Sequence, residues 1–496
     1  MIRKKTNQQQ KSFWIATDEL QDKPQITFYS KLNELFEKIS FGKQIRKICE
    51  PYYSDKTNCR PPIDPEVYFK MMIIGFFENL RSERGIASRC ADSLSIRAFL
   101  GYTLTESTPE HSSLSVIRKR LPQGLYSQVF SIVLKELRNN GLVKGKNLAL
   151  DTSVIEANAS LETLKNRMTE ESYGEYIKEL AKQAGIDIED KAAVARFDRK
   201  RKDRKTSNKE WYNPYDPDAK IGQTKDGATD MIYKPEHVVD LDTGAIIEAD
   251  ILLGDRGDTD CLTERIVDAQ TRLIDISDNP LEEEPIETVT SDKGYFNVQE
   301  ITEIRSLGIS TVIPDKDFNR NMNKLTDAEV VAVESACSAV KSKVGRALLR
   351  KRGMHVERSF AHVLDCGGQR RTTLKGIKKN RKRYLIAAAC YNLSLLMRTI
   401  FGIGTAKQWI AGNNFAYNYF LKSIISVQKQ FLYFLRFVKI IFCVKSYFLN
   451  FFDKLWFIQK ISYSTDSYVF SDITNEKVKN KLNNTLIRVR KLTPIY

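Results

Sequence analysis

Apolar residues recur at helical spacing over the first part of the chain, from about residue 27 to 140. Asp64 stands where a helix N-cap is expected, and Pro65 follows at the first helical position. The apolar side chains of Val67–Phe76 then surround much of the helix circumference, which is typical of a buried helix. The pattern predicts an all-α N-terminal domain over residues 1–140.

Two shorter helices are expected next, at Glu83–Ala87 and Ser95–Leu100. Short helices with a tight link and exposed arginines are typical of a helix-turn-helix. A helical bundle that only packs or dimerises accounts equally well for this pattern. The sequence leaves both interpretations open.

The middle of the chain changes to short β-rich runs separated by helical segments. Strands are expected at 146–155, 231–240, 245–251, 286–291 and 309–314. The turn residues Asp242–Gly244 join the second strand to the third as a hairpin. With helices at about 259–273 and 297–307, the pattern predicts an α/β domain over residues 141–407, with a mixed five-stranded sheet flanked by helices.

A polar, helical insertion at about 157–225 separates the first strand from the hairpin. Its basic run, residues 196–205, includes Arg201. A solvated linker explains such a run. An arm that grips phosphates is the alternative that we favour, because the run lies between two parts of the same predicted domain.

The composition changes again from residue 408, where aromatic residues and lysine dominate. Lysines interrupt the apolar stretches too often for a membrane span of about 18 uncharged residues. We expect a helical C-terminal extension over residues 408–496 and no membrane segment. The extension is either the product of a frame shift or read-through, or a genuine oligomerisation or target-DNA domain.

Charge and cysteine content narrow the function. The chain has 496 residues, enough for two or three domains, and a net charge of +16, which suits a polyanionic partner. Its 8 cysteines form no Cys-x-x-Cys pair, which argues against a zinc ribbon or a disulfide framework and favours a reducing cytosol. No secretory signal is visible at the N-terminus, so a cytoplasmic location is expected.

Three carboxylates occupy positions suited to metal binding. Asp151 and Asp292 each end a β-rich run, and Glu357 opens an amphipathic stretch. Isolated residues of these kinds often serve only as turn or helix caps. The order of elements around the two aspartates favours a joint role, because adjacent strands would bring them together. Such a set holds Mg²⁺ ions, which activate water and stabilise the oxygen leaving a phosphodiester.

Several motifs together resemble bacterial insertion-sequence transposases of the DDE class, whose catalytic domain has a ribonuclease-H-like fold. In the N-terminal part they are Arg60–Glu66, Leu80–Arg84, Phe99–Tyr102, Thr108–Ser112 and Arg118–Arg120. In the middle and C-terminal parts they are Asp216–Ala219, Tyr233–His237, Asp255–Thr259, Val356–Val363, Gly367–Arg371 and Tyr391–Arg398. The resemblance covers residues 25 to 407.

The resemblance implies that Asp151, Asp292 and Glu357 are the catalytic triad and hold two Mg²⁺ or Mn²⁺ ions. Glu334 is the nearest competitor for the glutamate, but the flanks of Glu357 match the family better. Oxygen ligands suffice for these ions, so the lone histidines, including His237, are expected to be structural.

The chain departs from one version of the family pattern. The lysine expected seven residues after the glutamate falls on Leu364, and the expected arginine is approximated only by Arg352, one residue out of register. We expect the phosphate contacts of that lysine to pass to residues that follow the glutamate. The candidates are His362, Arg370, Arg371 and Lys375.

By resemblance, the chain is expected to cleave the 3′ ends of an insertion sequence and to transfer them to target DNA. Its partners would be double-stranded DNA, at the terminal inverted repeats and the target, and further copies of itself, in a homodimer or larger assembly associated with the nucleoid. The residues expected to contact DNA are Arg81, Arg84, Arg118, Arg120, Arg201, Lys234, His362, Arg370, Arg371 and Lys375. A decayed or domesticated DNA-binding copy and a structure-specific nuclease remain as alternatives.

Overall fold

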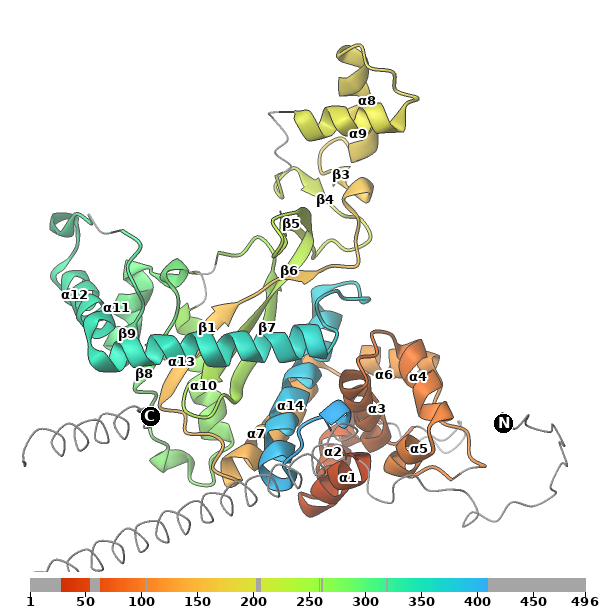
Figure 1. Ribbon diagram of the computed structural model, residues 1–496, viewed down its shortest axis with the longest axis vertical. Coiled ribbons are helices and arrows are strands. Elements are labelled where there is room, and N and C mark those ends of the chain that lie inside the picture. The colour runs from red at the N-terminus through yellow and green to blue at the C-terminus, as the bar shows by residue number, and fades with distance from the viewer. Residues whose placement is uncertain are drawn as a thin grey trace, which may run out of the picture. The chain divides into compact units, whose positions relative to one another are not determined.

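The computed structural model describes residues 28–53, 63–103, 105–201, 207–257, 259, 262–317 and 320–408. All of them lie in one compact unit, which extends to Asn413 (Figure 1). The C-terminal extension expected after residue 408 lies outside the described residues, so its helical character stays a prediction.

The N-terminal part is helical, as its periodicity predicted. Its helices are α1 (Phe28–Lys38), α2 (Phe41–Cys49), α3 (Pro65–Phe77), α4 (Glu83–Asp92), α5 (Leu94–Leu100), α6 (His111–Arg120) and α7 (Gln123–Asn139), with a 3-10 turn, η1, at Glu50–Tyr52. Asp64 caps α3 by accepting a hydrogen bond of 2.8 Å from the Glu66 amide, and most of α3 is buried. These features confirm the expected cap and core helix.

The two short helices are joined more tightly than a helix-turn-helix allows. Ser93 alone links α4 to α5, and its hydroxyl accepts from the Ile96 amide as the N-cap of α5. A helix-turn-helix needs a turn of three or four residues. The bundle interpretation therefore fits this pair of helices.

The central sheet has seven strands, with the order β2-β6-β1-β8-β9 and with β5 and β7 also paired to β6. The strands are β1 (Asn147–Thr152), β2 (Ile155–Glu156), β5 (Lys220–Gln223), β6 (Thr229–Asp240), β7 (Ile246–Leu253), β8 (Thr288–Thr290) and β9 (Ser310–Val312). The five expected strands are present as β1, β6, β7, β8 and β9. Expecting only five was wrong, because the long strand β6 also pairs with two short strands, β2 and β5, that have no clear alternation of their own.

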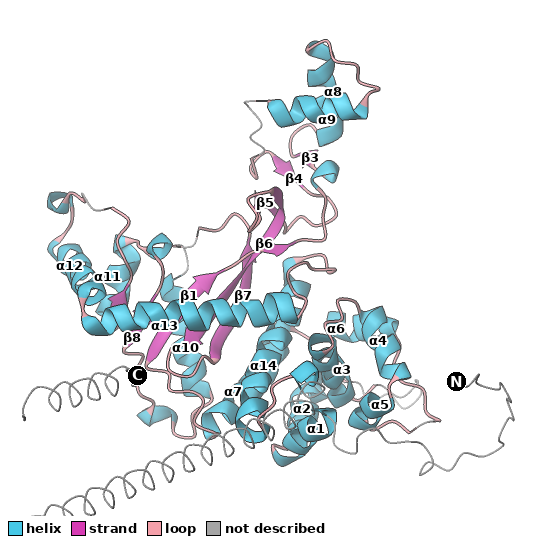
Figure 2. Cartoon of the chain, viewed as in Figure 1, coloured by secondary structure: helices cyan, strands magenta, loops and turns pink. Residues whose placement is uncertain are grey.

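The sheet is mixed. β1 pairs antiparallel with β6 but parallel with β8, and β8 pairs parallel with β9. Helices surround it (Figure 2), namely α10 (Leu262–Asp275), α11 (Val298–Ser306), α12 (Asp327–Lys341), α13 (Lys343–Phe360) and α14 (Ile377–Phe401). A π-helical turn follows α13 at Ala361–Cys366. Short 3-10 turns lie at Leu161–Thr163, Pro280–Glu282, Lys293–Tyr295 (η4) and Met322–Lys324. In Figure 1, α13 crosses in front of the strands, and it contacts β1, β6, β8 and β9.

The expected insertion carries α8 (Tyr173–Gln183), α9 (Lys191–Lys200) and a small sheet of β3 (Lys165–Asn166) and β4 (Trp211–Tyr212). The aromatic rings of Tyr173, Tyr176 and Trp211 pack together between these elements, with centroids 5.2 to 6.4 Å apart. The insertion therefore has a core of its own.

Helix α14 joins the N-terminal helices to the sheet, because it packs against α7, α3 and β7. Its Asn392 side chain is fully buried, accepts from the Ile246 amide at 3.0 Å and donates to the Ile246 carbonyl at 2.8 Å. The segment Ile377–Gln408 is long and apolar enough to cross a membrane, but 61% of its most apolar window is buried inside the protein. Its apolar character is that of a core helix.

Candidate active site

The register of β1 and β8 places two aspartates side by side. Ala149 pairs with Thr290 across these parallel strands, and Asp151 and Asp292 each follow two residues later. Parallel strands end at the same edge of a sheet. The structure therefore brings Asp151 and Asp292 together, as the positions of the two strands predicted.

A cation already lies between the two carboxylates. Arg352 of α13 places its Nη2 atom 2.7 Å from Asp151 Oδ2 and 3.7 Å from Asp292 Oδ2. The side chains of Arg352 and Asp151 are only 17% and 18% exposed, whereas that of Asp292 is 46% exposed. The Nε atom of Arg352 is buried without an acceptor among the described residues. Arg352 of α13 therefore neutralises part of the negative charge of the aspartate pair, and the pair is open to solvent at Asp292.

Local hydrogen bonds hold both aspartates in place. Asp151 accepts from the Thr152 amide at 2.9 Å. Asp292 caps η4 by accepting from the Gly294 amide at 2.7 Å. A carboxylate that accepts one such bond still has lone pairs for another cation.

The third carboxylate, Glu357, is exposed on α13. On the same helix Lys351 is 2.7 Å from Asp242, and His355 lies against Gly244, so this side of α13 faces the hairpin turn beside the start of β1. Glu357 follows His355 by two residues, a rotation of about 200° around a helix. Its side chain therefore projects on the side of α13 away from the hairpin turn. Arg352, which meets the aspartates, precedes Glu357 by five residues, a rotation of about 140°, so the two side chains lie on different faces of the helix.

Asp151 and Asp292 share one end of the sheet, but with Glu357 they do not form a closed metal cage. In the part of the chain that the structure describes, no three histidine, cysteine or carboxylate side chains are grouped tightly enough to hold an ion. Arg352, which faces the aspartates, occupies the space between them instead. The competitor Glu334 is exposed on α12, which packs against β9, two strands away from β1.

The donor atoms suit a divalent ion. Asp151 and Asp292 offer hard oxygen ligands, which Mg²⁺ and Mn²⁺ prefer. The Arg352 Nη2 atom lies where one cation contacts both carboxylates at once. A site that holds a guanidinium nitrogen between two carboxylates fits a metal ion at that position.

Comparisons with known families agree with this geometry. Residues 17–120 match the family described as Transposase domain (DUF772), and residues 195–393 match Transposase DDE domain. The chain belongs to the DDE transposases of insertion sequences. Asp292 and Glu357 lie within the second match, and Asp151 precedes it. No curated protein and no solved structure matched the chain.

The mixed sheet of this transposase is the ribonuclease-H-like arrangement that the DDE domain implies, with antiparallel β6 and β7 beside parallel β1, β8 and β9. Members of the family act on DNA and generally use divalent metal ions. The transposase is accordingly an enzyme of DNA transposition.

His237 joins three elements of the transposase beneath the site. It is fully buried, its Nδ1 atom is 2.8 Å from Ser359 Oγ, and its Nε2 atom is 2.7 Å from the Tyr384 hydroxyl. Ser359 donates its own proton to the Val356 carbonyl, so His237 must donate through Nδ1 and accept from Tyr384. Burial lowers the pKa of His237 to about 3, so the ring is neutral.

This chain of hydrogen bonds fixes α13 about its axis. His237 lies opposite Asp151 in the register of β6 and β1, and Ser359 follows Glu357 by two residues. The Phe360 ring also stacks on His237 at a centroid distance of 4.2 Å. Sequence reasoning expected His237 to be structural, but it had no signal for these partners, because both ring contacts come from distant helices.

The ten basic residues expected at DNA differ in exposure. Arg81, Arg84, Arg120, Arg371 and Lys375 are exposed, whereas Arg201, Lys234, His362 and Arg370 are partly buried. Of these, Arg370 contacts the segment that directly follows Asp151. It pairs with Asp365 at 2.8 Å, and its Nη1 atom is 3.4 Å from the hydroxyl of Ser153, two residues after Asp151.

Some of the partly buried residues have partners of their own. Arg201 pairs with Asp198 and lies over the Tyr176 ring, and Lys234 donates to the Arg256 carbonyl at 2.7 Å. Leu364, at the position of the family's lysine, is fully buried and belongs to the core. No phosphate contact is available from that position in this transposase.

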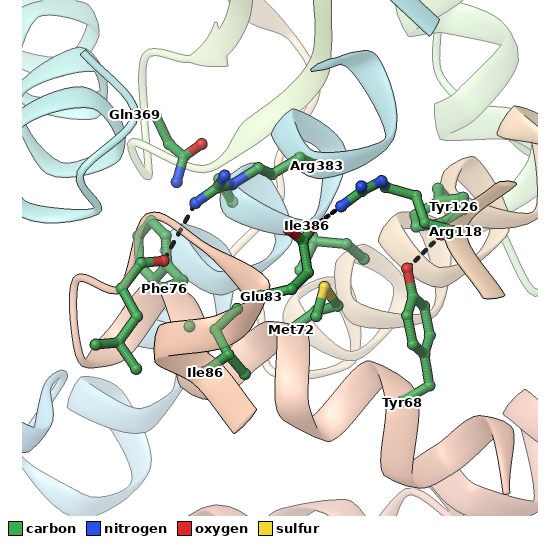
Figure 3. Close-up of a pocket in the computed structure, with 13 residues that line it drawn as sticks. Tyr68, Met72, Phe76, Glu83, Ile86, Arg118, Tyr126, Gln369, Arg383 and Ile386 are labelled. Carbon is green, nitrogen blue, oxygen red and sulfur yellow. Dashed lines mark hydrogen bonds and ion pairs between the residues drawn. The ribbon is translucent and has the colours of Figure 1, made fainter. Parts of the chain in front are cut away.

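Arg118 does not lie on a surface open to DNA. It is buried, forms an ion pair with Glu83 and lines a cavity of about 30 Å³ between the N-terminal helices and α14 (Figure 3). Lys382 and Arg383 of α14 close this junction, since Lys382 donates to the Arg118 carbonyl at 2.9 Å and Arg383 donates to the Leu80 carbonyl at 3.1 Å. The structure therefore gives Arg118 a packing role, in place of the expected DNA contact.

Proposed function

We propose that this transposase cleaves the 3′ ends of an insertion sequence and joins them to target DNA at the site formed by Asp151, Asp292 and Glu357. One observation carries the proposal. Asp151 and Asp292 lie side by side at the ends of parallel strands, with one positive nitrogen within 3.7 Å of both. This is the arrangement that a phosphodiester-cleaving metal site needs on its protein side.

Asp151 and Asp292 would hold the first of two Mg²⁺ or Mn²⁺ ions, and Glu357 would complete the ligand set from α13. When bound, the ions activate the attacking water or 3′-hydroxyl and neutralise the charge that develops on the leaving oxygen. Asp151 and Asp292 are fixed for this task by β1 and η4. Glu357 is fixed through the rotation of α13 that His237 and Ser359 maintain.

Arg352 has two partners in this mechanism. Without metal it neutralises the aspartates. With metal held by the aspartates, the Arg352 guanidinium would be available to a phosphate oxygen of the DNA, for which it has suitable donors. The buried Nε atom, which has no acceptor among the described residues, is one such donor.

DNA recognition falls to exposed basic residues on several elements. Arg81, Arg84 and Arg120 of the helical N-terminal part are proposed to contact the terminal inverted repeats. Arg370 contacts Ser153 just after β1, and Arg371 pairs with Glu156 of β2. Both are proposed to contact DNA at the reacting phosphate. Because the two ends of an element react together, a dimer or larger assembly is proposed for the reaction.

Substitution of the aspartates tests the proposal. Asp151→Asn and Asp292→Asn retain the size of the side chains but remove the negative charge that holds a cation, so each should abolish end cleavage in Mg²⁺ while DNA binding persists. Cleavage that survives both changes would refute the proposed site. Joining of a pre-cut end to plasmid DNA distinguishes transposition from simple nuclease activity, because a nuclease would not perform it.

A further inference from the structure

Helix α13 has an unusual excess of positive charge. Its sequence contains six basic residues and one acidic residue, Glu357. Two of the basic residues are engaged, because Lys351 pairs with Asp242 and Arg352 with the aspartates. The remaining four are exposed: Lys343, Arg346, Arg350 and Arg358.

The four exposed cations have no acidic partner among the described residues. Arg346 and Arg350 donate only to carbonyls of the preceding helical turn, at 3.4 and 3.3 Å. Helix α8 is different, because Glu175 and Glu179 alternate with Lys178 and Lys182 along it. A solvated helix face normally mixes charges in this way. The outer face of α13 therefore has a net charge that the protein itself does not balance.

Three of these cations share a face with the proposed catalytic glutamate. At 100° per residue, Lys343, Arg346, Arg350 and Glu357 lie within an arc of about 60°. The same face carries Met354, which is 58% exposed. From Lys343 to Glu357 the helix rises about 21 Å, which matches roughly six steps of duplex DNA. The cations thus form a line along the exposed face of α13 that leads to Glu357.

We infer that this outer face of α13, formed by Lys343, Arg346 and Arg350, is a track for the phosphates of the DNA that enters the active site. The inference rests on the proposed function, since it takes Glu357 to mark the reacting phosphate. Regularly spaced cations with no protein partner attract a polyanion, and phosphate binding releases its counterions. In Figure 1, α13 lies in front of the sheet.

Salt-dependent DNA binding tests the track. The double variant Arg346→Ala/Arg350→Ala is titrated with a short duplex of arbitrary sequence at several salt concentrations, without divalent metal. Each phosphate contact contributes about 0.9 to the slope of log affinity against log salt. The double variant is therefore expected to lower the magnitude of that slope by about 1.8. An unchanged slope would overturn the inference.

Helix α8 supplies the matched control. Lys178→Ala/Lys182→Ala removes two exposed cations at the same spacing of four residues, but from a helix whose charges are balanced. This control is expected to leave the slope as it is in the unmodified protein. If the slope fell equally in the control, the effect would be general attraction between charges, and the inference of a track would also be overturned.

A charge-retaining variant separates the track from folding defects. Arg346→Lys/Arg350→Lys should restore the slope, because the counterion effect depends on charge and not on the guanidinium. If the lysine variant binds as poorly as the alanine variant, the track is refuted. Because these titrations contain no metal, their result is independent of the Asp151→Asn and Asp292→Asn cleavage tests. Failure of the track and failure of the proposed function therefore give different results.

Discussion

Arg352 donates a hydrogen bond of 2.7 Å to Asp151, although 201 residues separate them in the sequence. The same nitrogen is 3.7 Å from Asp292. The protein thus supplies its own positive charge to the aspartate pair. A divalent ion that binds there has to compete with this arginine.

Replacement of this arginine should strengthen metal binding. Arg352→Gln removes the competing charge, so we expect the Mn²⁺ affinity of the DNA-free protein to rise about fivefold, the effect of an ion pair worth about 1 kcal/mol. Calorimetric titration or the electron paramagnetic resonance signal of free Mn²⁺ measures the change. Lys351→Gln is the control, because Lys351 pairs with Asp242 and not with the aspartates. Weaker Mn²⁺ binding in Arg352→Gln would contradict the competition.

Glu357 and Glu334 should differ in their effect on catalysis. Glu357→Gln is expected to lower end cleavage by about 10³-fold or more, as the loss of a catalytic group does. Glu334→Gln, which removes the same charge from α12, should leave cleavage unchanged. Both are measured on the same end substrate, with DNA binding as a check on folding. The opposite order of effects would move the third ligand to Glu334.

His237 should make stability fall in acid. Burial lowers the pKa of the folded protein's His237 to about 3, whereas an unfolded histidine titrates near 6.5. Between these values the unfolded chain binds a proton that the folded chain excludes, so the contribution of His237 to stability falls by roughly 1.4 kcal/mol for each pH unit below 6.5.

A variant that lacks His237 isolates this contribution. His237→Gln is expected to be less stable than the unmodified protein at pH 7, because it disturbs the bonds to Ser359 and Tyr384. Its deficit in the free energy of unfolding should shrink by about 2 kcal/mol at pH 5, since glutamine does not titrate. Urea unfolding at the two pH values measures the change. Tyr384→Phe, which retains the histidine, should show a deficit that stays nearly constant, and a constant deficit in His237→Gln would disprove the linkage.

Substitution of Arg118 should lower stability, whereas substitution of Arg84 should weaken DNA binding. Arg118→Ala leaves Glu83 without its buried partner and is expected to cost about 3 kcal/mol of stability. Its effect on the salt dependence of DNA binding should be negligible. Arg84→Ala removes an exposed cation, so we expect unchanged stability and a salt slope reduced in magnitude by about 0.9. Thermal unfolding and DNA titration of both variants decide the matter, and a reversed result would return Arg118 to the DNA surface.

The sequence alone determined the elements that depend on neighbouring residues. The cap at Asp64, the buried helix α3 and the five main strands follow from local spacing, which fixes the side that each element buries. The meeting of Asp151 and Asp292 also followed, because strand-end residues of adjacent parallel strands share one sheet edge.

The tertiary structure alone decided which side chains from distant segments contact the strands and helices. Arg352 at the aspartates, Tyr384 at His237 and the burial of Arg118 against Glu83 all join distant segments. The short strands β2 and β5 likewise depend on the long partner β6. Local periodicity shows that a side chain faces inward or outward, but its partner is set by how whole helices pack on the sheet. That packing is determined by contacts summed over the entire fold, and no short stretch of sequence contains it.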